Sequence, residues 1–269
     1  MQQPSLEEFR KLAGQSGLVP VYREIIADLD TPLTIFAKVA GGKSHAFLLE
    51  SLEGGEEWGR YSFIGLDPLV TMESVGEEIT IQWPEKKEKR KGDPIDALKQ
   101  LLSSFRACNT DYLPRFFGGA VGFMGYDMVR FMERLPELTP RLQLFPDSSL
   151  MVPSIVLIYD NLKQTLAIVH CVQIDASIPV EHQYAEAGQK IDAVITNLKN
   201  TPLPPTMLGV EGCERRHDFA SNMNQQAFHD MVEQAKEYIR AGDIIQVVLS
   251  QRFHTTTEVD PFTLYRALR

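Results

Sequence analysis

The stretch VPSIVLIYDNLKQTLAIVHCVQI, residues 152–174, contains two apolar runs separated by a short polar segment. Valine and isoleucine recur in both runs, and such β-branched residues are typical of strands. The separating residues, Asn161–Lys163, are few enough to form a turn between paired strands. We therefore predict strands over 152–160 and 165–174 that pair with each other.

Short apolar segments with turn residues between them occupy much of the chain before this hairpin. Their length and their flanking residues favour strands over helices. Pro32 opens one of these segments, and Gly76 forms the turn between the last two. The predicted strands lie at 18–26, 32–40, 46–52, 60–65, 68–74 and 78–83.

Five other segments combine a helical spacing of apolar residues with helix-capping residues. Serine, aspartate and asparagine cap the first turn of a helix, and glycine commonly follows its last turn. The predicted helices are 5–11 (capped by Ser5 with Glu8), 93–107 (Asp93, with Pro94 next), 180–200, 224–242 (Asn224, with Gly242 as the stop) and 260–269 (Asp260).

A glycine-rich segment, FFGGAVGFMGYD at residues 116–127, precedes the hairpin. Its glycines let backbone segments approach each other closely. The segment lacks the capped helix and the strand–helix–strand unit that surround a dinucleotide fingerprint. We therefore predict a tightly packed strand or bend here rather than a phosphate-binding loop.

The last quarter of the chain is organised differently. Residues 201–216 are rich in proline and glycine and lack periodicity, which predicts a linker. Residues 243–253, DIIQVVLSQRF, are predicted to form a strand. One face of that strand carries Gln246, Ser250 and Arg252, which suits either the wall of an anion-binding cleft or an ordinary half-exposed strand.

Charge and cysteine content exclude several classes of function. The 269 residues carry a net charge of -9, and the cationic cluster at residues 84–94 also contains acidic residues. No basic stripe is present to neutralise a nucleic-acid backbone. The widely spaced Cys108, Cys171 and Cys213 disfavour a disulfide framework or a zinc site. With no apolar leader and no run of membrane-spanning length, we expect a cytoplasmic protein that does not bind membranes.

Polar residues interrupt the predicted strand at 46–52, which reads AFLLESL. If that strand is buried, Glu50 and Ser51 both need hydrogen-bond partners, because an unsatisfied buried group costs about 1–3 kcal/mol. A neighbouring protein group or a bound amino acid would satisfy them equally well. The six histidines, by contrast, are scattered, and we expect each at the surface or in a satisfied core position.

Three segments, taken together, resemble the anthranilate synthase component I family of chorismate-using enzymes. They are FLLESLEGGEEWGRYSFIG (47–65), FFGGAVGFMGYD (116–127) and EYIRAGDIIQVVLSQRF…DPFTLYRALR (237–269). The resemblance extends from about Val19 to Arg269 and implies an α+β fold. It implies an antiparallel-sheet-rich N-terminal regulatory domain at 1–200, a linker at 201–223, and the truncated start of the chorismate-binding α/β domain at 224–269.

The resemblance also implies an activity for the parent protein. Members of the family convert chorismate and ammonia to anthranilate and pyruvate, use Mg²⁺, and receive ammonia from a glutamine amidotransferase partner, component II. Tryptophan inhibits them. The chain resembles roughly the first half of component I, so we expect it to be inactive by itself, with the main catalytic residues and the metal ligands outside it.

Particular residues match the family's functional positions. The inhibitor site implied by the resemblance contains Leu49, Glu50 and Ser51, with Tyr61 as a further candidate. Gln246 stands where water-adding relatives have a basic lysine, which favours an ammonia-using enzyme. Aminodeoxychorismate synthase also fits Gln246. A non-catalytic amino-acid sensor and a purely structural fragment are further alternatives.

Overall fold

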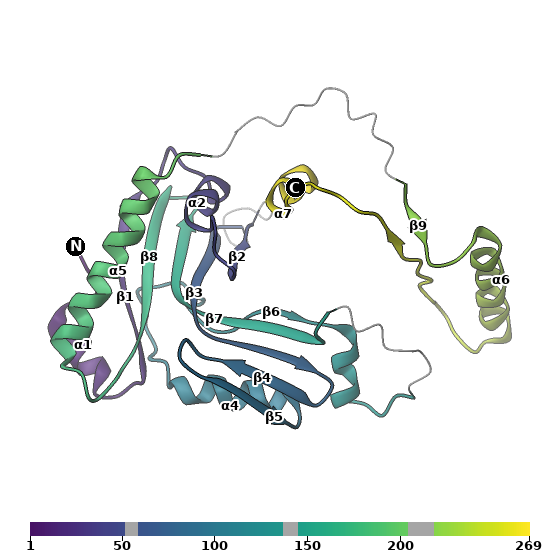
Figure 1. Ribbon diagram of the computed structural model, residues 1–269, viewed down its shortest axis with the longest axis horizontal. Coiled ribbons are helices and arrows are strands. Elements are labelled where there is room, and N and C mark those ends of the chain that lie inside the picture. Colours follow the sequence, from purple (N-terminus) through teal and green to yellow (C-terminus); the bar gives the residue numbers. More distant parts are fainter. Residues whose placement is uncertain (52–58, 137–144, 204–217) are drawn as a thin grey trace. The chain divides into compact units, whose positions relative to one another are not determined.

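The computed structural model describes residues 1–51, 59–136, 145–203 and 218–269 (Figure 1). The chain divides into two compact units, residues 1–206 and 207–269. The helices of the first unit are α1 (Leu6–Ala13), α2 (Pro32–Val39), α4 (Pro94–Phe105), the 3-10 helix η1 (Tyr126–Phe131) and α5 (Val180–Asn200). Its strands are β1 (Leu18–Ile26), β2 (Ala46–Leu49), β3 (Tyr61–Val75), β4 (Glu78–Gln82), β5 (Lys87–Lys91), β6 (Val121–Met124), β7 (Ser148–Asp160) and β8 (Thr165–Gln173).

An eight-stranded antiparallel sheet forms the centre of the first unit, with the strand order β1-β8-β7-β3-β4-β5. Strand β2 also pairs with β3, and β6 with β7. The predicted hairpin is confirmed, because Asp160 at the end of β7 lies opposite Thr165 at the start of β8. The long strands β3 and β7 run from the part of the sheet beside β8 to the part beside β4 and β6 (Figure 1). The predicted α+β class is confirmed.

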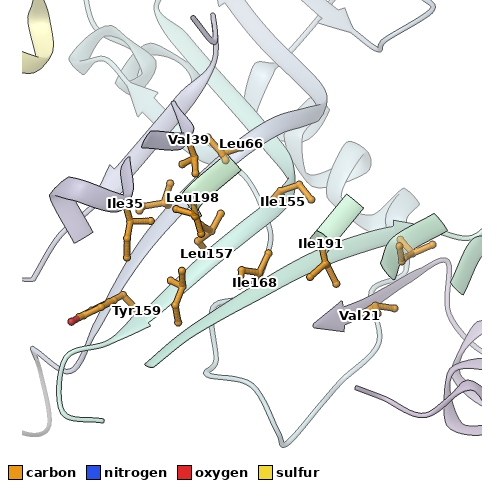
Figure 2. Packing of buried hydrophobic residues seen from close by; sticks show 14 of the residues in the cluster. Val21, Ile35, Val39, Leu66, Ile155, Leu157, Tyr159, Ile168, Ile191 and Leu198 are labelled. Atoms are coloured by element: carbon orange, nitrogen blue, oxygen red, sulfur yellow. The ribbon is translucent and has the colours of Figure 1, made fainter. Parts of the chain in front are cut away.

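Apolar side chains cover both faces of this sheet, because successive strand residues point to opposite sides. On one face, residues of α1, α2 and α5 pack on β3, β7 and β8. Figure 2 shows Ile35 and Val39 of α2 and Leu198 of α5 close to Leu157 of β7. On the other face, Ala97, Leu101 and Phe105 of α4 pack against a second cluster. Each fully buried aliphatic side chain contributes about 1.5–3 kcal/mol to folding.

Residues 32–40, predicted to be a strand, form helix α2 instead. The Thr31 side chain accepts a hydrogen bond from the Thr34 backbone N–H, and Thr34 Oγ1 accepts one from the Thr31 N–H at 2.8 Å. Pro32 occupies the first turn, where its missing N–H costs nothing. The helical spacing of Ile35 and Val39 places both in the core. The proline that was interpreted as the entrance to a strand therefore starts a helix.

The predicted strands at 60–65 and 68–74 are one continuous strand, β3. A shift of register between Pro68 and Val70 marks a β-bulge, and Asp67 adopts a φ of 48° just before it. A bulge inserts an extra residue while pairing continues on both sides. The polar Asp67–Pro68 pair therefore marks an irregularity within β3 and not a break in the sheet.

The glycine-rich segment forms the tight packing that was predicted. Residues 121–124 make strand β6, paired with β7. A Cβ atom added to Gly122 would lie 2.0 Å from the carbonyl oxygen of Ser149. Only glycine permits this approach of two backbones.

The second unit contains β9 (Ala220–Ser221), α6 (Gln225–Ala241), β10 (Phe253–His254) and α7 (Pro261–Leu268). The caps Asn224 and Asp260 are confirmed, and Gly242 ends α6 with a φ of 80°. The strand predicted at 243–253 is wrong over most of its length. Only its last residue, Phe253, belongs to a strand, β10, which pairs with β9. The residues before it have no neighbouring strand, within the described part of the chain, to bond their backbone groups, and a strand needs such a partner.

The predicted linker at 201–223 is described only at its two ends. Residues 204–217 of it lie outside the described residues, and strand β9 occupies 220–221. None of the helices in the described ranges combines the length and the apolar character that a membrane span requires.

Candidate ligand site at the start of β3

The candidate residues Leu49, Glu50 and Ser51 lie where the chain leaves the sheet. Leu49 pairs with Phe63 in the last register position between β2 and β3, and its side chain is exposed. Glu50 and Ser51 follow the end of the strand and are half-buried. The expectation that they interrupt a buried strand is therefore wrong, since β2 ends before them. Their position leaves them accessible to a ligand.

Ser51 is held next to β3 by hydrogen bonds to the buried hydroxyl of Ser62. The Ser51 N–H donates to Ser62 Oγ at 3.5 Å, and Asn161 Nδ2 donates to the same oxygen at 3.4 Å. Asn161 Nδ2 also donates to the carbonyl oxygens of Gly59, at 3.2 Å, and Arg60, at 3.0 Å. The turn between β7 and β8 therefore fixes the chain on both sides of residues 52–58. The acidic loop predicted at those positions lies outside the described residues.

An ion pair between Arg60 and Asp160 also joins the start of β3 to the end of β7. Arg60 Nη2 donates to Asp160 Oδ2 at 2.7 Å, and Arg60 Nε donates to both carboxylate oxygens at 3.1 and 3.2 Å. The backbone N–H groups of Leu162 and Lys163 donate to Asp160 Oδ1. Burial by itself raises the pKa of Asp160, but these hydrogen bonds outweigh burial and hold the pKa below its usual value. The carboxylate is therefore charged and fully engaged.

Tyr61 extends the site with aromatic surface. The guanidinium carbon of Arg60 lies 4.9 Å from the centre of the Tyr61 ring, which is a cation–π distance. The Phe63 ring lies 6.3 Å from that of Tyr61 and meets Phe116 edge to face at 5.1 Å. Tyr61 also borders a cavity of about 120 Å³ together with Tyr22 and other residues. An aromatic ligand would find matching surface here.

Ser51 and Tyr61 both lie at the start of β3, because the Ser51 N–H bonds to Ser62, the residue that follows Tyr61. Gln246 belongs to the second unit, where it is exposed in a segment without secondary structure. Its place in the wall of a cleft stays a prediction.

Arg60, Ser62, Asp160 and Asn161 are site residues that the sequence did not reveal. The contact between Arg60 and Asp160 spans a sequence separation of 100 residues. The turn at Asn161–Lys163 was predicted, but only the pairing of β3 with β7 shows what it holds. The register of β3 with β7 places Tyr61 opposite Asp160, and this brings Arg60 next to the turn.

A metal centre finds no support among residues 1–51, 59–136, 145–203 and 218–269. No group of three or more His, Cys, Asp and Glu side chains there is placed to hold a metal ion. These residues therefore do not fit a Mg²⁺ site. They do fit the binding of a small molecule by hydrogen bonds and aromatic contacts.

Known proteins resemble the chain over almost all of its length. Anthranilate synthase component 1 of Synechocystis sp. is 40% identical over 99% of this chain and 54% of its own length. The protein of that name from Acetivibrio thermocellus is 36% identical over 99% of this chain and 54% of its own length. The chain therefore spans about half the length of these curated relatives.

A solved structure and a family model agree with these relatives. The crystal structure of anthranilate synthase component I from Streptococcus pneumoniae matches with a TM-score of 0.59 and 26% identity, over 91% of this chain and 52% of that one. The family model described as chorismate binding enzyme matches residues 44–269, which is most of the chain. This chain belongs to the chorismate binding enzyme family.

Proposed function

We propose that the chain is the N-terminal part of an anthranilate synthase component I. The observation that carries the proposal is the match of almost the whole chain to proteins of that name at 36–40% identity. The agreement of the fold with the pneumococcal enzyme supports it independently. The same relatives favour anthranilate synthase over aminodeoxychorismate synthase.

The whole protein would convert chorismate and ammonia to anthranilate and pyruvate in tryptophan biosynthesis. Ammonia would add to the ring of chorismate while the ring hydroxyl leaves as water. The enolpyruvyl group would then leave as pyruvate, taking up a proton as the ring loses one and becomes aromatic. An amide at Gln246 has no useful basicity, so it would not activate water as a competing nucleophile. Mg²⁺, when bound by the full-length protein, would neutralise the chorismate carboxylate. A glutamine amidotransferase partner would supply the ammonia.

Tryptophan would inhibit the whole protein by binding at Leu49, Glu50, Ser51 and Tyr61. The half-buried Ser51 and the rings of Tyr61 and Phe63 supply the polar and aromatic contacts that such a ligand needs. Inhibition would require tryptophan to bind one conformation of the protein more tightly than the active one. The anchoring of Ser51 through Ser62 would make that preference possible.

The activity is tested in a chimera that joins this chain to the unmatched remainder of the Synechocystis relative. With chorismate, ammonium and Mg²⁺, the chimera is expected to form anthranilate, measured by its fluorescence. The intact relative is the positive control, and this chain alone is expected to be inactive. A chimera that folds, as judged by circular dichroism, but forms no anthranilate would contradict the proposal.

The inhibitor site is tested in the same chimera. Ser51→Arg would place a large charged side chain at the proposed site and is expected to raise the tryptophan concentration for half-inhibition at least tenfold, while kcat changes less than twofold. Ser103→Arg, which changes an exposed serine near the end of α4, is the control for a new charge. Unchanged inhibition in Ser51→Arg would remove Ser51 from the inhibitor site and leave the assignment of the activity intact.

A further inference from the structure

A cleft lies between helix α5 and the sheet, on the face that carries α1 and α2. It consists of two sections of about 350 Å³ each, and both sections are bordered by Asp67, Ser154 and Lys190. Each volume falls within the range of about 300–1,000 Å³ that is common for small-molecule sites. The candidate site at Ser51 lies instead at the start of β3, so the two sites are separate.

One side of α5 forms a wall of this cleft. Gln183, Ala187 and Lys190 border one section, and Lys190, Val194 and Asn197 border the other. The spacing of three to four residues places them on one stripe of the helix. The stripe from Gln183 to Asn197 covers about 21 Å at the usual rise of a helix. Apolar residues such as Pro68, Leu69 and Ile155 contribute the rest of the lining.

The bulge of β3 places a carboxylate at the junction of the two sections. Asp67 adopts a φ of 48°, which few residues other than glycine, asparagine and aspartate tolerate. The register shift between Pro68 and Val70 interrupts the regular pairing of β3 with β7 at this point. Bulges commonly redirect a side chain next to a functional site. The strained backbone therefore serves to point Asp67 outwards beside the cleft.

Charges of both signs meet at this junction. Lys190 Nζ forms an ion pair with Glu186 at 2.9 Å, and the two side chains are 50% and 45% exposed. Lys43 forms an ion pair with Asp67, also partly exposed. Exposed pairs of this kind contribute about 0–1 kcal/mol each, so a ligand can replace one partner at little cost. Both an anion and a cation on the ligand would find a counter-charge.

Two polar groups on the sheet side have no partner among the described residues. His170 is 5% exposed, and neither of its ring nitrogens is hydrogen-bonded there. The expectation that each histidine is at the surface or satisfied is therefore wrong for His170. Ser154, on neighbouring β7, is half-buried and its hydroxyl makes no hydrogen bond within the described ranges. Buried polar groups in native proteins are almost always bonded, so the buried His170 requires an explanation, while the half-buried Ser154 is available to a ligand.

We propose that this cleft binds a small zwitterion of the amino-acid type with a compact apolar side chain. The carboxylate lies beside Lys190, the ammonium group beside Asp67, and the side chain on the apolar surface of Leu69 and Ile155. Ser154 donates a hydrogen bond to the ligand, and His170, which borders the same section of the cleft, lies beside it. The proposal is independent of chorismate chemistry and of the site at Ser51.

A matched series of probes tests the proposal on the whole chain. Leucine carries both charges, 4-methylpentanoate lacks the amine, and 3-methylbutylamine lacks the carboxylate. Backbone amide shifts of the isotope-labelled chain are followed by NMR during titration with each probe. Leucine is expected to give saturable shifts around Ser154, His170 and Lys190, with a Kd at least tenfold lower than either truncated probe.

Two variants assign the charges. Lys190→Met is expected to weaken leucine binding at least fivefold and to leave 3-methylbutylamine unchanged. Asp67→Asn keeps a residue that tolerates positive φ, and it is expected to weaken leucine and leave 4-methylpentanoate unchanged. Lys199→Met, an exposed residue near the end of α5, is the matched control and is expected to bind leucine like the parent.

Three results would overturn the proposal. The first is the absence of saturable shifts with leucine at concentrations up to 10 mM, a range chosen because it is about tenfold above a weak millimolar Kd. The second is equal binding of all three probes. The third is a set of shifts confined to the amides around Ser51 and Tyr61.

Discussion

The imidazole of His170 lies under α5, with Lys190, Glu186 and Asp67 as its charged neighbours. Burial, and next the positive charge of Lys190, lower its pKa from 6.5 to about 4. Neither nitrogen has a hydrogen-bond partner among the described residues, and the negative charges of Glu186 and Asp67, which favour the charged ring, do not outweigh burial and Lys190. The folded protein therefore contains a neutral histidine at every pH above about 5.

This residue predicts a pH dependence of stability. Between pH 6.5 and 4 the unfolded chain binds a proton at His170 and the folded chain does not, so the free energy of unfolding falls as the pH is lowered. A shift from 6.5 to about 4 corresponds to a loss of about 3 kcal/mol. Urea denaturation at a series of pH values measures it.

His170→Phe is expected to remove this part of the pH dependence and to leave stability at pH 7 equal or higher, because an unsatisfied polar group is replaced. His182→Phe, which changes an exposed histidine of α5, is the control and should retain the dependence. An identical pH profile in the His170→Phe variant would show that His170 does not cause it.

Among the elements, the turn between β7 and β8 anchors the start of β3, a role that cannot be predicted from its own sequence. Asp160 is 6% exposed and accepts hydrogen bonds from Arg60, Leu162 and Lys163. Asn161 holds Ser62 and the backbone on the far side of residues 52–58. One turn therefore anchors the start of β3 and, through Ser62, the candidate ligand residue Ser51.

Removing the charge of Asp160 is expected to be costly. In Asp160→Asn the partly buried Arg60 loses its counter-ion and the turn loses hydrogen bonds, so the free energy of unfolding should fall by about 2–4 kcal/mol. Asp192→Asn is the matched control, because Asp192 pairs with Arg23 but its side chain is 58% exposed. That change is expected to cost less than about 1 kcal/mol. Equal losses in urea denaturation would contradict the anchoring role.

Helix α2 shows how local signals compete at the scale of an element. The sequence PLTIFAKVA contains β-branched and aromatic residues, which favour a strand. It also begins with a proline, which can start either a strand or a helix. The reciprocal hydrogen bonds between Thr31 and Thr34 and the contact of the helix with α5 decide for a helix. Only the second of these is a tertiary effect; the first was present in the sequence as a Thr-x-x-Thr pattern.

At the scale of the whole molecule, the second unit exposes much apolar surface. Ile245 is 97% exposed, Val248 83% and Leu268 79%. No residue of α6 or α7 is buried. Contiguous exposed apolar surface commonly marks an interaction site or an aggregation site.

This surface predicts self-association of the chain. Sedimentation velocity is expected to show a weight-average mass that rises with concentration. The double variant Ile245→Lys with Val248→Lys should shift this rise to at least fivefold higher concentration. Leu29→Lys, which changes a 94% exposed residue of the first unit, is the control and should leave it unchanged. A monomer at every concentration in the parent chain would exclude the association.

The sequence by itself determined the β7–β8 hairpin, the helix starts at Ser5, Asp93, Asn224 and Asp260, and the resemblance to the chorismate-using family. These features depend on residues that are close together in the chain, where capping, turn and periodicity rules apply directly. Glu50 and Ser51 stood out in the sequence as polar residues that need partners. Their assignment to a ligand site, together with Leu49 and Tyr61, came from the resemblance.

The tertiary structure decided what depends on distant contacts. Pairing with β7 made β3 a single strand across its bulge, and it brought Asp160 to Arg60. Packing of α5 on the sheet buried His170 without a partner among the described residues. Residues 243–251 carry a strand-like pattern but form no strand within the described residues, because backbone hydrogen bonds between strands require a neighbour that local sequence cannot supply.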